Sequence, residues 1–235
     1  INNLLNKNKQ NFEKIELKNF EINVDLKKYK NISTKKFNFI PITFIKGKII
    51  FFDGKNYIAT MHDINLNLIL EEASMGAILK GRFLNDNIYI NLNSKQIDHK
   101  QSTDIIFKMS KLSLLMKANL FNSKKDKNTI NGNILLKKNK HRLTTIFDYK
   151  DGEITFNKSN LASVFLDGKL EGKVTTLPYL NFDLDLDLNK LNFTKLYTYF
   201  LSLDEKRRKN LFKINNKING KLNFSSSKVH SRYNL

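Results

Sequence analysis

Apolar and polar residues alternate along much of this chain, most clearly between residues 41 and 94. Within residues 63–70 the apolar positions are Ile64, Leu66, Leu68 and Leu70, and the polar positions are Asp63, Asn65 and Asn67. Because successive side chains of a β-strand point to opposite faces, this spacing predicts a strand with one apolar and one polar face.

The same alternation returns twice before residue 94. Leu79 and Phe83 alternate with Lys80 and Arg82, and the next run carries Ile88, Ile90 and Leu92. Asp53-Gly54 is a two-residue turn signal, since glycine accepts a positive φ. The stretch therefore predicts a meander of antiparallel strands.

A second meander is predicted from residue 130 onward. Asn139-Lys140, Asp151-Gly152 and Asp167-Gly168 are its predicted turns. The most regular alternation of the chain follows, with Leu180, Phe182, Leu184, Leu186 and Leu188 on one side and Asn181, Asp183, Asp185 and Asp187 on the other. Residues 105–121 also keep a period of two and are predicted as a strand.

The period changes after residue 192. Leu196, Phe200 and Leu203 are spaced by four and three, which is typical of one face of a helix. We therefore expect an all-β fold, mainly an antiparallel meander forming an elongated curved sheet with an apolar concave face, and one or two short helices near 194–212. The expected segments are an N-terminal strand and linker (1–36), a first meander (37–121), a second meander (122–192), a helical insertion (193–213) and a resumed, truncated strand (214–235).

Composition limits the functional classes only in part. The 235 residues contain no cysteine, which excludes disulfides and thiolate metal sites, and no apolar run approaches the about 20 residues of a membrane-spanning helix. The net charge is +19, which fits an anionic partner. Compositional drift in an AT-rich genome is the favoured explanation, because lysine is spread along the chain rather than clustered. Since the sequence begins with Ile1, we expect a fragment of a longer protein.

No catalytic or metal-binding motif appears in the sequence. The Asp183, Asp185 and Asp187 triplet resembles the start of a calcium-binding loop, but Leu188 and Thr194 stand where that loop needs glycine and glutamate. The four histidines have no partner at metal-ligand spacing. We therefore expect no enzyme activity and no cofactor. Aromatic residues are not interleaved with the basic runs, so nucleic acid is not an expected partner.

The apolar face has two interpretations. It can be one layer of a closed β-sandwich, covered by a second layer. It can instead be the open face of a curved sheet that holds acyl chains, which needs shape and apolarity but no catalytic motif.

Two segments resemble the AsmA-like family of bacterial envelope proteins. The first runs from residue 42 to 94, with a glycine at position 47 in its first strand and at position 81 in its third, and the second is LDGKLEGKVTTLPYLNFDLDLDLNKLNFTKL. Together the matching patterns cover most of residues 37–196.

The resemblance implies a segment of a periplasmic protein anchored to the inner membrane of a Gram-negative bacterium. Such a protein supports outer-membrane biogenesis and holds or conducts phospholipid acyl chains along an apolar β-groove. The membrane anchor would be missing from this chain, and other envelope proteins are possible partners. The alternative is a structural or partner-binding β-domain with no ligand. The candidate groove residues are Ile64, Leu66, Leu68, Leu79, Phe83, Ile90, Leu92, Leu180, Phe182, Leu184, Leu186 and Leu188.

Overall fold

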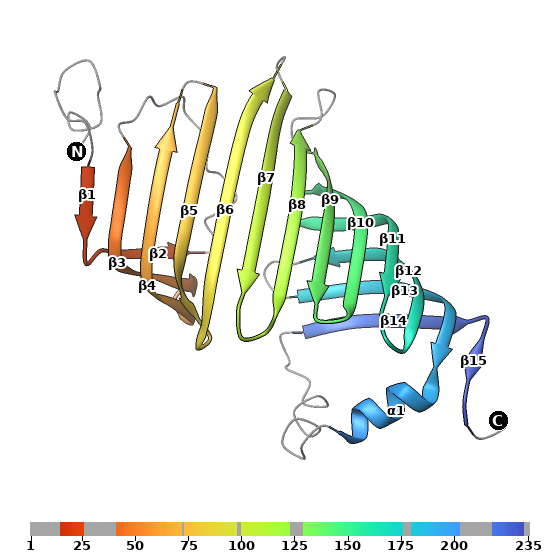
Figure 1. Cartoon of the computed structure of the whole chain (residues 1–235). Helices are drawn as coiled ribbons and strands as arrows, with labels where there is room; N and C mark the ends of the chain where they lie inside the picture. Colours follow the sequence, from red (N-terminus) through yellow and green to blue (C-terminus); the bar gives the residue numbers. More distant parts are fainter. Residues whose placement is uncertain are drawn as a thin grey trace. The chain divides into compact units, whose positions relative to one another are not determined.

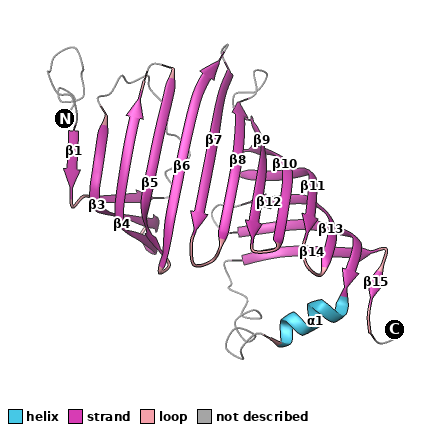
Figure 2. Cartoon of the chain, viewed as in Figure 1, coloured by secondary structure: helices cyan, strands magenta, loops and turns pink. Residues whose placement is uncertain are grey.

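The computed structural model describes residues 15–25, 41–71, 73–97, 100–122, 129–175, 180–202 and 218–232. In these residues it contains fifteen strands and one helix (Figures 1 and 2). The strands pair mainly antiparallel, so the all-β prediction is confirmed. Two compact units divide the chain, Ile1–Lys127 and Asn128–Leu235, and each is described by itself.

Unit 1 contains eight described strands. They are β1 (Ile15–Lys18), β2 (Glu21–Asp25), β3 (Ile42–Asp53), β4 (Asn56–Leu70), β5 (Ser74–Phe83), β6 (Asp86–Ile97), β7 (Lys100–Met109) and β8 (Leu114–Asn122). Strands β3 to β8 form an antiparallel meander, and the predicted Asp53-Gly54 turn joins β3 to β4. Strands β1 and β2 both pair in parallel with β3.

Bulges bend the first two long strands of the meander. The register of β3 and β4 shifts on both sides of Gly47, and Lys46 and Asp63 have φ values of 53° and 50°. An extra residue in one strand increases its local twist and bends it. Strand β3 consequently pairs with β1 before the bulge and with β2 after it.

A small cluster of buried side chains forms the core of unit 1. The buried members are Ile49, Ile64, Leu79, Ile88 and Met109, one from each strand from β3 to β7. Phe20, just before β2, and Ile22 and Val24 of β2 pack against this cluster. The Phe20 ring lies over Gly47, where a Cβ atom would clash with it, and contacts the Phe44 ring edge-to-face at 5.1 Å.

Unit 2 contains the remaining described strands. They are β9 (Thr129–Lys138), β10 (His141–Lys150), β11 (Glu153–Ala162), β12 (Leu166–Thr175), β13 (Leu180–Asn192), β14 (Ile218–Ser226) and β15 (Val229–His230). Strands β9 to β13 pair antiparallel in sequence order, with turns at Asn139-Lys140 and Asp151-Gly152 as predicted. Strands β14 and β15 pair in parallel with β13.

The predicted turn at Asp167-Gly168 is wrong. Both residues lie inside β12, and the chain reverses instead around Ser163, whose Oγ accepts hydrogen bonds from the amides of Phe165 and Leu166. Gly168 is needed for a different reason. A Cβ atom there would clash with the backbone of β13 at Asp187 and Leu188, so this glycine permits close strand approach.

The period-two segment 105–121 is two strands and not one. A turn at residues 110–113 separates β7 from β8, and Ser113 has a φ of 50°. The apolar positions change from odd numbers in β7 to even numbers in β8, because residues that pair across the turn, such as Met109 and Leu114, lie on the same face.

The predicted helical segment begins with α1 (Phe193–Leu201). Asn192 caps its N-terminus, since its side-chain oxygen accepts a hydrogen bond from the Lys195 amide at 2.9 Å. The rest of the predicted helical segment, residues 203–213, lies outside the described residues.

Gly172 gives a direct test of the close packing between β12 and β13. It has a φ of +125°, and a Cβ atom there would lie 2.9 Å from Leu184 Cα and closer still to the Asp183 carbonyl oxygen. We expect Gly172→Ala to lower the free energy of unfolding by at least about 2 kcal/mol, measured by urea titration. Gly76→Ala is the matched control, since its nearest atom is Ile69 Cβ at 3.9 Å, and it should cost less than about 0.5 kcal/mol. Equal losses in the two variants would contradict the proposed close approach.

Asp86 joins two neighbouring turns of unit 1. Its carboxylate, in a residue only 3% exposed, accepts hydrogen bonds from the amides of Lys111 at 2.8 Å and Leu112 at 3.0 Å. Burial acts to raise the pKa of Asp86, but the backbone hydrogen bonds outweigh it and hold the pKa below its ordinary value. The charged form of Asp86 therefore stabilises the folded state.

The sign of the pH dependence follows from this lowered pKa. The contribution of Asp86 is present above the unfolded-state pKa of about 3.9 and is lost as the pH falls through the lower folded-state pKa. We expect Asp86→Asn to lose less stability than the wild type when acidified from about pH 5 to pH 2, measured by urea midpoints. Parallel pH dependences in both proteins would show that this carboxylate has no such role.

Candidate apolar binding faces

Cross-strand registration aligns the apolar residues of unit 1 into continuous rows on one face. One row, directly paired from strand to strand, comprises Phe44, Leu66, Leu79, Ile90, Phe107 and Met116. A parallel row comprises Ile42, Leu68, Ala77, Leu92, Ile105 and Ala118. With about 4.8 Å between strands, each row spans about 24 Å. We call this surface the apolar face of unit 1.

Unit 2 has an apolar face of the same kind. Its rows are Ile130, Tyr149, Ile154, Val174 and Phe182, then Phe147, Phe156, Gly172, Leu184 and Leu222, and then Leu170, Leu186 and Phe224. Glycines, which have no side chain, leave gaps in these rows, and the ring of Phe182 fills the gap over Gly220.

Each apolar face is only partly covered. The strongest contacts between described elements of each unit join sheet neighbours or α1 and β15, so no second layer of described strands packs on either face. In a closed sandwich the central side chains would be fully buried. Here Leu66, Ile90, Phe107 and Met116 all remain partly exposed. Exposure increases toward the last strand of unit 2, where Leu222 and Phe224 are 54% and 69% exposed.

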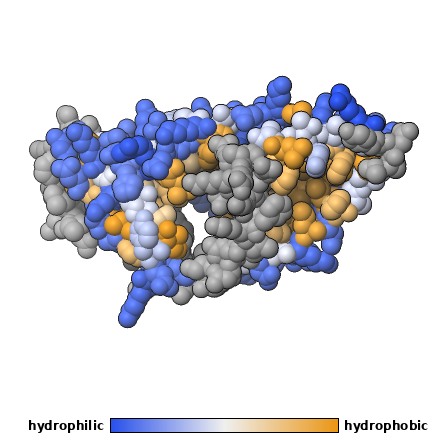
Figure 3. All heavy atoms as spheres, turned by 90° about the horizontal axis from the view of Figure 1, so that it is seen from below, coloured by the Kyte–Doolittle hydropathy of each residue, from blue (hydrophilic) through white to orange (hydrophobic). Residues whose placement is uncertain are grey.

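The opposite face is polar and contains several paired charges. Glu153 and Lys173 form an ion pair at 2.8 Å, and their hydrogen bond raises the pKa of Lys173. The carboxylates of Asp185 and Asp187 accept hydrogen bonds from Asn223 at 2.9 Å and from the Ser225 hydroxyl at 3.1 Å. In the space-filling view, hydrophobic and hydrophilic side chains gather in separate regions of the surface (Figure 3).

The structure places the predicted groove residues on these faces in two groups. Ile64, Leu66, Leu68, Leu79, Phe83, Ile90 and Leu92 lie on the apolar face of unit 1, and Leu180, Phe182, Leu184, Leu186 and Leu188 lie on β13 in unit 2. Ile64, Leu79 and Leu188 are buried, so they pack within the sheet and cannot contact a ligand directly. The other nine are partly exposed or exposed.

Sequence reasoning missed several contributors to the same rows. Phe107 and Met116 complete the longest row of unit 1, and Phe147 and Phe156 lie in the middle of unit 2. The signal was present as a period of two at Ile105, Phe107 and Met109. What the sequence lacked was the register, which decides that residues distant in the chain are adjacent across strands.

Polar chemistry is limited on the described surface. A shallow depression of about 460 Å³ lies on the polar side, where Arg82 forms an ion pair with Asp63 and Lys80 and Tyr89 line the wall. Within the described residues, no group of three His, Asp or Glu side chains could hold a metal ion.

Comparisons with known proteins add no relative to this picture. No protein-family model, curated protein or solved structure matches the chain. Among the helices that the structure describes, none has the length and apolarity needed to cross a membrane.

Alanine substitutions can distinguish the packed core from the open part of the face. Ile64 is completely buried, and Ile64→Ala should lower the free energy of unfolding by about 3 kcal/mol. Leu68, four residues along β4 on the same face, is partly exposed, and Leu68→Ala should cost less than about 1.5 kcal/mol. If urea titrations gave equal costs, the face at Leu68 would be covered in solution.

Proposed function

We propose that this chain is a segment of a periplasmic, inner-membrane-anchored protein that supports outer-membrane biogenesis by holding or conducting phospholipid acyl chains. The observation that carries the proposal is the pair of apolar faces, whose rows of half-exposed side chains no second layer of described strands covers. The resemblance of residues 37–196 to AsmA-like proteins supports the cellular setting.

An acyl chain suits these faces chemically. The rows consist of aliphatic and phenyl side chains, so the ligand gains by leaving water and needs no specific polar contact. Each buried methylene contributes about 0.8 kcal/mol, and ten of them about 8 kcal/mol before the entropic cost of binding. The polar headgroup would remain in solvent beyond the edge of the apolar rows.

Each apolar face also suits movement of a ligand from row to row. Contacts between apolar surfaces are not directional, so a chain shifted by one row makes equivalent contacts. A site built from hydrogen bonds would instead fix one position. The proposed role in lipid conduction follows from this lack of a preferred register.

Native mass spectrometry of the purified chain tests this proposal. We expect phospholipid to co-purify, and Leu184→Asp to reduce lipid occupancy at least about tenfold, because it places a charge on the apolar face. Leu222→Asp makes the same change at a side chain that is 54% exposed, where the effect on folding is smaller.

Asn181→Asp is the matched control for these variants. It adds the same charge to the opposite, polar side of β13 and should leave lipid occupancy unchanged. Absence of phospholipid from the wild type, together with no uptake from added phosphatidylglycerol or phosphatidylethanolamine, would refute the proposal.

The second candidate is a structural or partner-binding β-domain with no ligand. The observation that favours it is the packed cluster around Ile64 in unit 1, which side chains of this chain form among themselves. This candidate predicts that the Leu222→Asp and Asn181→Asp variants behave alike in the lipid experiment.

A further inference from the structure

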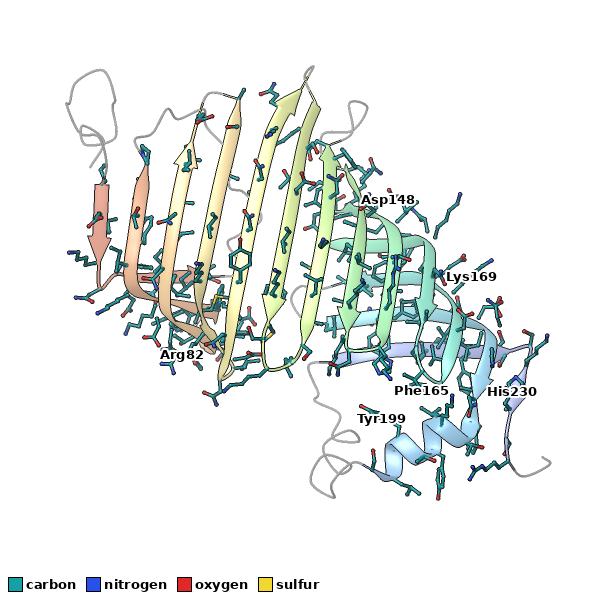
Figure 4. All side chains as sticks on the ribbon, viewed as in Figure 1. Arg82, Asp148, Phe165, Lys169, Tyr199 and His230 are labelled. Carbon is teal, nitrogen blue, oxygen red and sulfur yellow. The ribbon has the colours of Figure 1, made fainter. Side chains whose placement is uncertain are left out.

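One end of unit 2 brings together three turns and the helix. The ring centroids of His141 and Phe165 are 5.3 Å apart, and those of Phe165 and Tyr199 are 5.7 Å apart. These contacts join the start of β10, the β11–β12 connection and α1 (Figure 4). The Arg232 amide donates to the Thr194 hydroxyl at 2.9 Å, which adds the segment after β15. We call residues 138–142, 163–167, 190–202 and 227–232 the helical end of unit 2.

Helix α1 has one broad apolar face, part of which is exposed. Leu196 and Phe200 are partly buried and lie on one side of the helix. Phe193, Tyr197 and Leu201, spaced by four residues, form a second stripe. Their exposed fractions are 43%, 54% and 49%, and the first two rings stack at 6.3 Å. Unit 2 therefore covers only part of this apolar face and leaves the stripe of Phe193, Tyr197 and Leu201 exposed to solvent.

The helical end is also strongly basic. Its four segments contain seven Lys or Arg residues, namely Lys138, Lys140, Arg142, Lys190, Lys195, Lys228 and Arg232, and a single carboxylate, Asp167. All seven are exposed, and none forms an ion pair with a carboxylate in the described part of the chain. Elsewhere on unit 2 the pattern differs, since the polar face pairs Lys173 with Glu153.

We propose that the helical end of unit 2 docks on the surface of an anionic lipid bilayer. An exposed aromatic stripe at an end of the unit that carries seven exposed cations matches interfacial helices, whose apolar side enters the headgroup region while basic residues meet lipid phosphates. Phenylalanine and tyrosine suit this depth because an apolar ring is combined, in tyrosine, with a polar tip.

This docking surface is distinct from the apolar faces that the proposed function assigns to acyl chains. It lies on α1 and the turns, and it needs intact bilayer rather than a single extracted lipid. The two proposals can therefore fail separately.

Vesicle co-sedimentation of the full chain tests the docking. The probes are phosphatidylcholine vesicles with and without about 30 mol% phosphatidylglycerol, at about 0.15 M salt, where long-range attraction is screened. We expect binding to the anionic vesicles and little binding to the neutral ones. No binding to anionic vesicles at this salt concentration would overturn the proposal.

Charge-matched variants separate docking from general attraction by a chain of net charge +19. Lys140→Ala with Arg142→Ala should weaken binding about thirtyfold, since each basic residue near the surface contributes about fivefold. Lys158→Ala with Lys169→Ala removes the same charge from exposed positions of β11 and β12, and Lys169 lies away from α1 (Figure 4). Equal losses in both pairs would overturn the proposed surface.

Aromatic substitutions test insertion of the stripe. Phe193→Ser with Tyr197→Ser should weaken binding about tenfold, through lost apolar burial. The control pair, Ile78→Ser with Ile146→Ser, removes exposed apolar side chains from other strands and should leave binding unchanged. If the aromatic pair instead abolished a chain dimer seen by gel filtration, with vesicle binding unaltered, the stripe would be a protein interface and the membrane proposal would be wrong.

Discussion

Cross-strand registration of apolar side chains is the constraint on which the rest of this structure depends. Side chains alternate between faces, so a slip of one residue in any strand pair would move a whole apolar row into the polar face. The rows through Leu79 and through Leu184 stay continuous because their residues pair directly across neighbouring strands. Where the register does shift, as around Gly47, a bulge and a positive φ at Lys46 absorb the extra residue.

Each unit consists of a single described layer of strands. This explains both how the unit is stabilised and why many of its apolar side chains stay exposed. Some apolar side chains, such as Ile64 and Leu188, are buried against neighbouring strands of the same sheet. Others, such as Leu66 and Phe107, are partly exposed, and Phe224 on the last strand keeps most of its surface in water. Apolar area left exposed in this way is costly for a free protein and is the common property of surfaces that bind another molecule. The lipid proposal rests on this property.

The sequence predicted the strands well because alternation is a local signal. It predicted the turns at Asp53-Gly54 and Asp151-Gly152, where glycine has a positive φ. It failed at Asp167-Gly168, because glycine is needed there for close approach to β13, and a dipeptide cannot distinguish the two requirements.

Local sequence patterns also could not predict which strands pair. Strands β1 and β2 are short and lie parallel to β3, and nothing in their own residues specifies that partner. For the candidate faces, the sequence identified nearly every contributing position on β4, β5, β6 and β13. It missed those on β7, β8, β10 and β11, whose place in the rows depends on register.

Charge is distributed unevenly over unit 2. One region uses charged side chains in pairing between strands and another presents them to solvent, and the overall net charge does not reveal this difference. On the polar face, the register sets Lys169 opposite Asp187 and Lys173 opposite Asp183, and Lys173 also forms an ion pair with Glu153, so positive and negative side chains lie close together there. At the helical end, seven cations face one carboxylate. An excess of lysine that came only from nucleotide composition would raise the net positive charge of both regions equally. Compensation along the strands favours sheet pairing without cross-strand repulsion, whereas uncompensated charge beside exposed aromatic rings favours an anionic partner. The net charge is therefore informative only after the fold shows where it lies.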